Sequence, residues 1–166
     1  MKKIMFFGLL LMASVFMVGA TNQIPSASRY LFFETDMAGA NEVPPVVTVV
    51  TGDATFRYDK VTGEFQFKVN VAAPKGSAPT VVASHVHCAP AGQNGPVGVT
   101  LFSGPPKKVN GVLAFGKITA PNAGNACGWT TISDITDAMR TGNAYVNVHT
   151  TTFPSGEIRG QLSLTP

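Results

Sequence analysis

Charged residues, histidine and cysteine are all scarce in this sequence. Charged side chains make up 13% of its 166 residues, and it contains three histidines and two cysteines. Lysine and arginine do not cluster beyond Lys107 and Lys108, which argues against a nucleic-acid partner. The glycine-rich stretch 88–99 lacks the GxxxxGK pattern of a phosphate loop, and the chain has no GxSxG nucleophile motif. Phosphate-loop and serine-hydrolase chemistry are therefore not expected.

The first twenty residues have the pattern of a secretory signal peptide. Two lysines precede an apolar run over 4–18, and small residues at 18–20 form a cleavage site. We therefore expect 1–20 to be removed on export, 21–29 to be a flexible lead-in, and 30–166 to form one domain. An uncleaved anchor is the alternative, because the apolar run borders on transmembrane length.

Export changes how the charge of the chain is interpreted. Without the two N-terminal lysines, ten basic residues face nine acidic ones, so the expected net charge of the mature protein is +1. The basic isoelectric point then comes mostly from the targeting segment. The expected location is secreted or periplasmic, with no membrane attachment after cleavage.

The remaining sequence has the alternation of an antiparallel β protein. Residues 64–71 alternate without exception, with phenylalanine and valine on one face and polar residues on the other. Turn residues at 60–63 join this segment to a preceding strand, which predicts a hairpin over 52–71. Other strands are expected over 30–37, 80–87, 96–102, 111–119, 143–149 and 157–164, with turns at Asn94-Gly95, Pro105-Pro106 and Asn110-Gly111.

One short segment is expected to be helical. Residues 133–141 offer Ser133 as an N-cap, apolar residues on one side, and Gly142 as a stop. The sequence therefore predicts an all-β fold, an antiparallel β-sandwich of about eight strands with Greek-key, immunoglobulin-like or superoxide-dismutase-like connections. This sandwich would carry one short helix near 133–141.

The two cysteines predict one disulfide. Cys88 and Cys127 both lie in the exported part of the chain, where an oxidising environment favours their pairing. Chain-entropy arithmetic for a loop of this length gives a stabilisation of roughly 4 kcal/mol. Cys88 directly follows His87, so the bond would restrain the chain beside that imidazole. Trp129 is expected to pack in the core or over the disulfide.

The three histidines predict a metal site. His85 and His87 are two residues apart on an expected strand, so their side chains lie on one face, roughly 6–7 Å apart along the chain. His149 lies on another expected strand, on the same face as Tyr145 and Asn147. Three imidazoles without a free thiolate favour copper or zinc over calcium or magnesium. The alternative is that the imidazoles are exposed at strand ends or bonded to the backbone.

Acidic and basic residues accompany the histidines. Glu157, Arg159 and Gln161 alternate on the expected last strand, so they could share the polar face with His149. Glu157 is a weak candidate for a fourth metal ligand. Glu42, next to Pro44-Pro45, could pair with Arg159, line a pocket or be exposed, and we assign it no acid–base role.

Three stretches carry a resemblance to a known family. They are ANEVPPVVTVVTGDATFRYD at 40–59, HVHCAPAGQNGPVGVTLF at 85–102 and GNAYVNVHTTTFPSGEIRGQL at 142–162. They resemble the CHRD domain, named for its repeats in chordin, over about residues 30–165. The resemblance implies a β-sandwich in an extracytoplasmic setting, and it implies no particular activity.

A fainter likeness concerns the histidines. The His-Val-His strand, the neighbouring cysteine, the later strand histidine and the late arginine are similar to features of copper/zinc superoxide dismutases. That likeness implies copper ligation by His85, His87 and His149, with Arg159 guiding a small anion. A bridging histidine and a zinc cluster are missing, so the likeness implies a copper-only site. Shared fold does not confer function, so this comparison is an analogy.

Two functions follow from the sequence. The first is binding of copper, or alternatively zinc, by the three histidines, in copper handling or redox chemistry on a small oxygen species. The second is a non-catalytic module that binds an extracellular protein or glycan, with structural histidines. The sequence predicts no oligomeric state.

Overall fold

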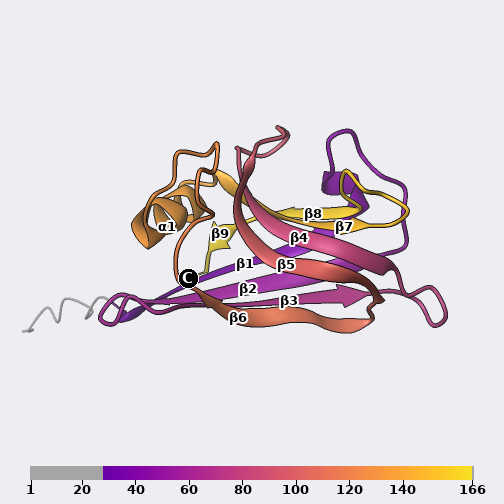
Figure 1. Ribbon diagram of the computed structural model, residues 1–166, viewed down its shortest axis with the longest axis horizontal. Coiled ribbons are helices and arrows are strands. Elements are labelled where there is room, and N and C mark those ends of the chain that lie inside the picture. The colour runs from indigo at the N-terminus through magenta and orange to yellow at the C-terminus, as the bar shows by residue number, and fades with distance from the viewer. Residues whose placement is uncertain (1–27, 166) are drawn as a thin grey trace, which may run out of the picture.

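The computed structural model describes residues 28–165, which form two packed layers of antiparallel strands (Figure 1). The predicted signal peptide and most of the lead-in lie outside the described residues. In chain order the elements are β1 (Tyr30–Ala38), the 3-10 helix η1 (Gly39–Asn41), β2 (Thr51–Asp59), β3 (Phe65–Ala72), β4 (Thr80–Cys88), β5 (Val97–Lys108), β6 (Gly111–Ile118), α1 (Ile132–Arg140), β7 (Ala144–Thr150), β8 (Ile158–Gln161) and β9 (Ser163–Leu164).

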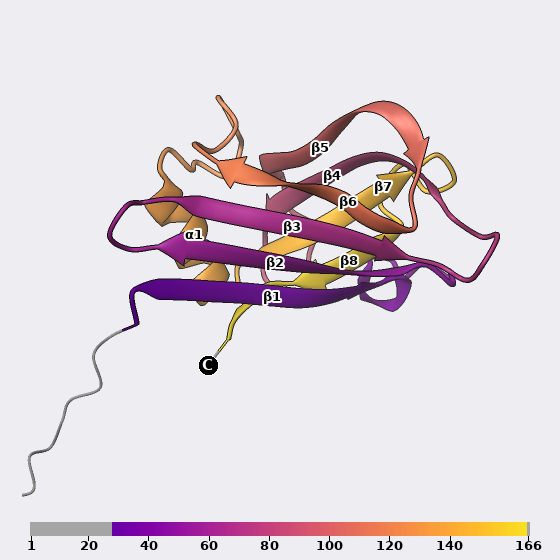
Figure 2. The same cartoon turned by 90° about the horizontal axis from the view of Figure 1, so that it is seen from below.

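The strands form one continuous sheet that folds over itself. Their order is β5-β4-β7-β8-β1-β2-β3-β6, and β9 pairs with β1. β1 and β8 share only one residue pair, Ala38 with Arg159. At this junction the sheet folds, so that β4, β5, β7 and β8 lie over β1, β2, β3 and β6 (Figures 1 and 2). The predicted all-β antiparallel sandwich with one short helix is confirmed.

The core lies between the two layers and contains the apolar faces of both. Phe33, Phe56 and Phe65 come from the lower layer, and Val146 and Ile158 come from the upper layer. Because side chains alternate along a strand, filling this core from β4 and β7 directs the intervening residues to the outer face of the upper layer. The predicted histidine positions lie on that outer face.

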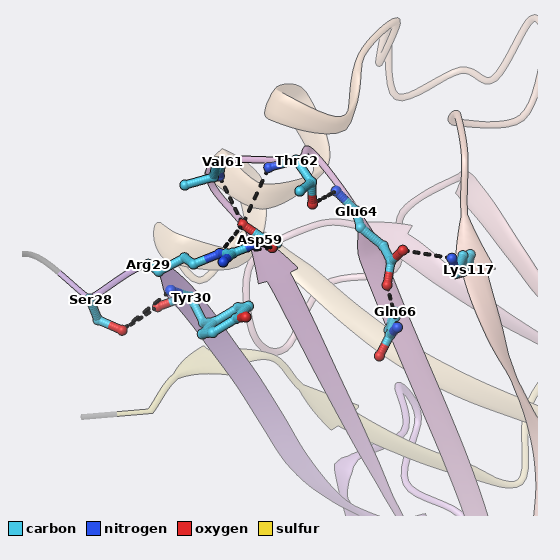
Figure 3. Close-up of polar contacts among 9 residues, drawn as sticks. All are labelled: Ser28, Arg29, Tyr30, Asp59, Val61, Thr62, Glu64, Gln66 and Lys117. Atoms are coloured by element: carbon cyan, nitrogen blue, oxygen red, sulfur yellow. Dashed lines mark hydrogen bonds and ion pairs between the residues drawn. The ribbon is translucent and has the colours of Figure 1, made fainter.

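The predicted hairpin is formed by β2 and β3, and Asp59 closes its turn (Figure 3). The Asp59 carboxylate pairs with Arg29 and accepts hydrogen bonds from the backbone N–H groups of Val61 and Thr62. The Arg29 guanidinium, followed by these backbone donors, holds the pKa of Asp59 well below its usual range. The hairpin is therefore tied to the start of β1.

One predicted turn is wrong. Pro105 and Pro106 lie inside β5 instead of ending it. Proline has no backbone N–H group to donate to a neighbouring strand. Because β5 is an edge strand, no such hydrogen bond is needed on its outer side. Val81 on β4 pairs with Lys107 on β5, and Ala83 pairs with Ser103. Two residues along β4 therefore correspond to four along β5, and the prolines fall in the resulting bulge.

The helix begins earlier than predicted. Its N-cap is Thr131, not Ser133, because the Thr131 side chain accepts from the Asp134 N–H while the Asp134 side chain accepts from the Thr131 N–H. Ile135 and Met139 on α1 are buried in the core. Gly142 follows the helix at a φ of 69°, in the left-handed region that glycine tolerates. No helix within residues 28–165 is long and apolar enough to cross a membrane.

The predicted disulfide between Cys88 and Cys127 is confirmed. It joins the end of β4 to the segment before α1, where Trp129 packs against the core. Gly98 on β5 lies directly under this tryptophan. A Cβ atom at Gly98 would come 2.2 Å from the Trp129 ring and 3.2 Å from Cys127 Sγ. The close contact of β5 with the disulfide segment therefore requires glycine at this position.

Replacing Gly98 tests this packing. We expect Gly98→Ala to lower the free energy of unfolding by about 1–3 kcal/mol, because the added methyl group overpacks a closed contact. Gly104→Ala is the matched control on the same strand, since a Cβ atom there meets nothing within 4 Å. Urea denaturation of both variants is the measurement. An equal effect of the two substitutions would contradict the assigned packing of Trp129.

Candidate metal centre

The pairing of β4 with β7 brings the three histidines together. His85 and His87 share one face of β4, where they lie opposite Asn147 and Tyr145 of β7. His149 lies two residues further along β7 from Asn147. One ring nitrogen from each histidine lies within 4.8 Å of the other two. A single point therefore lies within about 2.8 Å of all three nitrogens, somewhat beyond the metal–nitrogen bond of about 2.0–2.1 Å.

The three imidazole rings are close neighbours. Ring centroids are separated by 5.6 Å for His85 and His87, 5.0 Å for His85 and His149, and 6.0 Å for His87 and His149. His85 Nδ1 lies 3.1 Å from His149 Nε2. The three imidazoles predicted as ligands are thus brought into one cluster.

Backbone carbonyls fix two of the rings. His87 Nδ1 lies 2.9 Å from the Gly95 carbonyl oxygen, and His149 Nδ1 lies 2.9 Å from the Pro154 carbonyl oxygen. A carbonyl oxygen only accepts, so each Nδ1 carries the hydrogen and each neutral ring directs an Nε2 lone pair elsewhere. His87 Nε2 is buried without a hydrogen-bond partner among the described residues. Histidines that ligate metals are commonly held through the other ring nitrogen in this way.

Burial keeps the cluster uncharged. It lowers the pKa of His85 to about 4, with the neighbouring His149 and His87 adding to the effect. Burial also lowers the pKa of His87 and of His149, partly opposed by their backbone hydrogen bonds. All three rings are therefore neutral at pH 7, and neutral imidazole is the form that ligates a metal.

Tyr145 joins the cluster to a buried cation. Its ring is stacked on His87, with centroids 4.8 Å apart and planes 6° apart. The guanidinium of Arg159 lies over the same ring, 3.3 Å from its centroid. Arg159 donates to Asn94 Oδ1 and to the Gln93 carbonyl. Tyr145 was not identified from the sequence as part of the site. Its place on the same strand face as Asn147 and His149 is the signal that could have identified it.

The predicted role of Arg159 as an anion guide is not supported by this position. Its exposed fraction is 2%, and each of its two terminal nitrogens donates one hydrogen bond to the loop that precedes β5. A guide for a small anion needs a guanidinium that solvent reaches. The physical reason for the difference is that residues 93–94 fold back over β8, which the alternation of β8 alone does not reveal.

Glu42 lies in the segment after η1, which rises beside the upper layer (Figure 1). It is 7% exposed, and its Oε1 accepts a hydrogen bond of 2.6 Å from Asn147 Nδ2. Burial raises the pKa of Glu42 to about 7, against the opposing effects of Arg159 and Asn147. Glu42 lines a pocket of about 440 Å³ together with His87, Tyr145 and Asn147. Glu42 was expected to pair with Arg159, to line a pocket or to be exposed. In the structure it lines a pocket.

Glu157, the weak candidate for a fourth ligand, lies apart from the histidine cluster. Its two carboxylate oxygens accept hydrogen bonds of 2.6 Å from the hydroxyl groups of Thr48 and Thr150. Glu157 precedes β8 and follows Gly156, whose φ of 133° turns the chain. The predicted alternation therefore begins at Ile158, and Glu157 does not share a face with Arg159.

Comparison with known proteins identifies the fold family. Residues 33–162 match the family model described as the CHRD domain. No curated protein and no solved structure matches the chain. CHRD domains occur in extracellular proteins, and the Cys88–Cys127 disulfide agrees with an extracytoplasmic location. Because the match covers most of the sequence, this chain belongs to the CHRD domain family.

Proposed function

We propose that this exported protein binds one copper or zinc ion through His85, His87 and His149, in the secreted or periplasmic space. The observation that carries the proposal is the convergence of three imidazole nitrogens within 4.8 Å of one another. Two of the rings are already oriented by backbone carbonyls, and all three are neutral near pH 7. Such a site needs little rearrangement to hold an ion.

The donor set favours copper or zinc. Both cysteines are in the disulfide, so no thiolate is available, and the cluster contains no carboxylate. Imidazole nitrogen suits copper and zinc, whereas calcium and magnesium require oxygen ligands. Three protein ligands leave a fourth position for water or a small ligand, the arrangement typical of exchangeable or reactive metal sites. Copper handling is the role that this arrangement favours. Redox chemistry on a small oxygen species is the further possibility, and the buried Arg159 gives it no anion guide.

A second candidate is a module that binds a protein or glycan on the opposite layer. Its outer face carries Phe32, which is 47% exposed, beside a groove of about 240 Å³. Arg57, Gln66 and Lys68 line the same groove. They belong to β2 and β3, which lie side by side in Figure 2. Aromatic, amide and basic groups together suit a glycan. Metal analysis separates the two candidates, because this groove contains no histidine.

Metal content tests the first candidate. Residues 21–166, refolded free of metal and then titrated with Zn²⁺ or Cu²⁺, should bind one ion per chain. His87→Ala and His149→Ala should each weaken metal binding by at least about 100-fold. Removing a residue that only hydrogen-bonds a metal ligand typically lowers metal affinity about 10–100-fold, and removing a ligand itself should lower it more. Elemental analysis and isothermal titration calorimetry are the measurements.

The control for this titration is Glu34→Gln, which removes an exposed carboxylate from the opposite layer. This variant should bind as the wild type does. Binding that survives both histidine substitutions, or that Glu34→Gln also weakens, would mean that the ion lies elsewhere on the surface.

The affinity should depend weakly on pH above pH 6. Three histidines with the ordinary pKa of about 6.5 would lose affinity by roughly 50-fold between pH 7.5 and 6, because protons compete with the metal. The lowered pKa values of these histidines keep them unprotonated to lower pH, so we expect a much smaller loss. Zinc titrations at the two pH values decide this. A loss of 50-fold would show that the rings are hydrated in solution.

His85 should change its tautomer when the metal binds. Without metal, His85 Nδ1 must donate to His149 Nε2, which lies 3.1 Å away and whose own hydrogen is on Nδ1. With metal, both nitrogens must present lone pairs to the ion, so the hydrogen of His85 moves to Nε2. Nitrogen-15 NMR of the imidazoles measures this. Retention of the Nδ1–H form in the loaded protein would exclude ligation through His85 Nδ1.

A further inference from the structure

Arg159 is a buried cation that forms no ion pair with the acidic residues of the described chain. Its exposed fraction is 2%, and none of the ion pairs within residues 28–165 includes it. Both groups to which it donates, Asn94 Oδ1 and the Gln93 carbonyl, are neutral. Buried charges are normally paired, because removing an ion from water is costly. Within hydrogen-bond distance the guanidinium therefore meets neutral groups, and the carboxyl group that it affects at longer range is that of Glu42.

This charge lies close to the histidine cluster. β4, β7 and β8 are neighbours in that order, so Tyr145 lies between His87 and Arg159. The stacking distances place the Arg159 guanidinium carbon no more than about 8.1 Å from the centre of the His87 ring. The same positive charge contributes to the lowered basicity of His87. An ion held by His87 therefore experiences the field of Arg159.

The ligands do not compensate for that field. The three imidazoles are neutral, so a bound ion keeps its full charge. The adjacent pocket contains one carboxyl group, that of Glu42. Burial raises its pKa to about 7, so near neutral pH it is only partly ionised and offsets the charge of Arg159 only in part. Each additional positive charge on the ion is therefore opposed by Arg159. At about 10 Å and an effective dielectric constant of about 20, this opposition amounts to roughly a tenfold effect on affinity.

We propose that Arg159 biases the three-histidine site toward a monovalent ion, Cu⁺, over divalent ions such as Zn²⁺. This inference rests on the proposed function and names the ion that the site prefers. Arg159 does not touch the metal. It acts as a positioning residue through Tyr145 and as a fixed charge. Binding is reversible ligation with no change of oxidation state, and the copper is supplied as Cu⁺.

The test compares the Cu⁺ and Zn²⁺ affinities of the mature protein by competition with chelators at pH 8. Ascorbate is the reductant, so that copper stays Cu⁺ while the Cys88–Cys127 disulfide remains intact. Arg159→Gln should raise the affinity for Zn²⁺ relative to Cu⁺ by about tenfold. Arg159→Lys, which keeps the charge, should leave this ratio within about threefold of the wild type. If the role of Arg159 were purely structural, both variants would lower the affinities for Cu⁺ and Zn²⁺ by the same factor.

Glu42→Gln gives a signal of opposite sign. At pH 8 the Glu42 carboxyl is mostly ionised, so its loss should lower the affinity for Zn²⁺ relative to Cu⁺. Arg159→Met, which keeps the apolar stem and removes the charge, carries the test if Arg159→Gln does not fold. An unchanged ratio in the folded charge-altering variants would overturn the inference while leaving the metal site intact. Absence of metal binding by the wild type would instead overturn the proposed function.

Discussion

The pairing of β4 with β7 is the interaction on which the rest of the site depends. It places His85 and His87 opposite Asn147 and Tyr145, with His149 two residues further along. A slip of β7 by one residue would turn Tyr145, Asn147 and His149 toward the core and remove His149 from the cluster. Val86 and Val146 pair within the same register and are fully buried, so the free energy of packing the core also enforces the geometry of the histidines.

The loops around this pair of strands complete the arrangement. The stretch between β4 and β5 gives its Gly95 carbonyl to His87 and two acceptors to Arg159. The disulfide at Cys88 restrains the start of the same stretch. The turn after β7 gives the Pro154 carbonyl to His149. Fold stability and site geometry therefore rest on shared contacts, and a metal ion would cross-link strands that the core has already aligned.

Period-two alternation was enough to predict the sandwich, the β2–β3 hairpin and the common face of His85, His87 and His149. Alternation could not place residues whose position depends on distant segments. Arg159 is buried because residues 93–94 cover it, and Glu157 turns toward Thr48 and Thr150 because it precedes the strand. The prolines of β5 lie in a strand because an edge tolerates them. These outcomes depend on tertiary contacts that sequence spacing does not encode.

X-ray absorption spectroscopy of the metal-loaded mature protein counts the ligands of the ion itself. We expect three imidazole nitrogens at about 2.0 Å, with the outer-ring scattering that imidazole produces. A coordination shell of mainly oxygen atoms, or one with a single imidazole, would contradict this expectation.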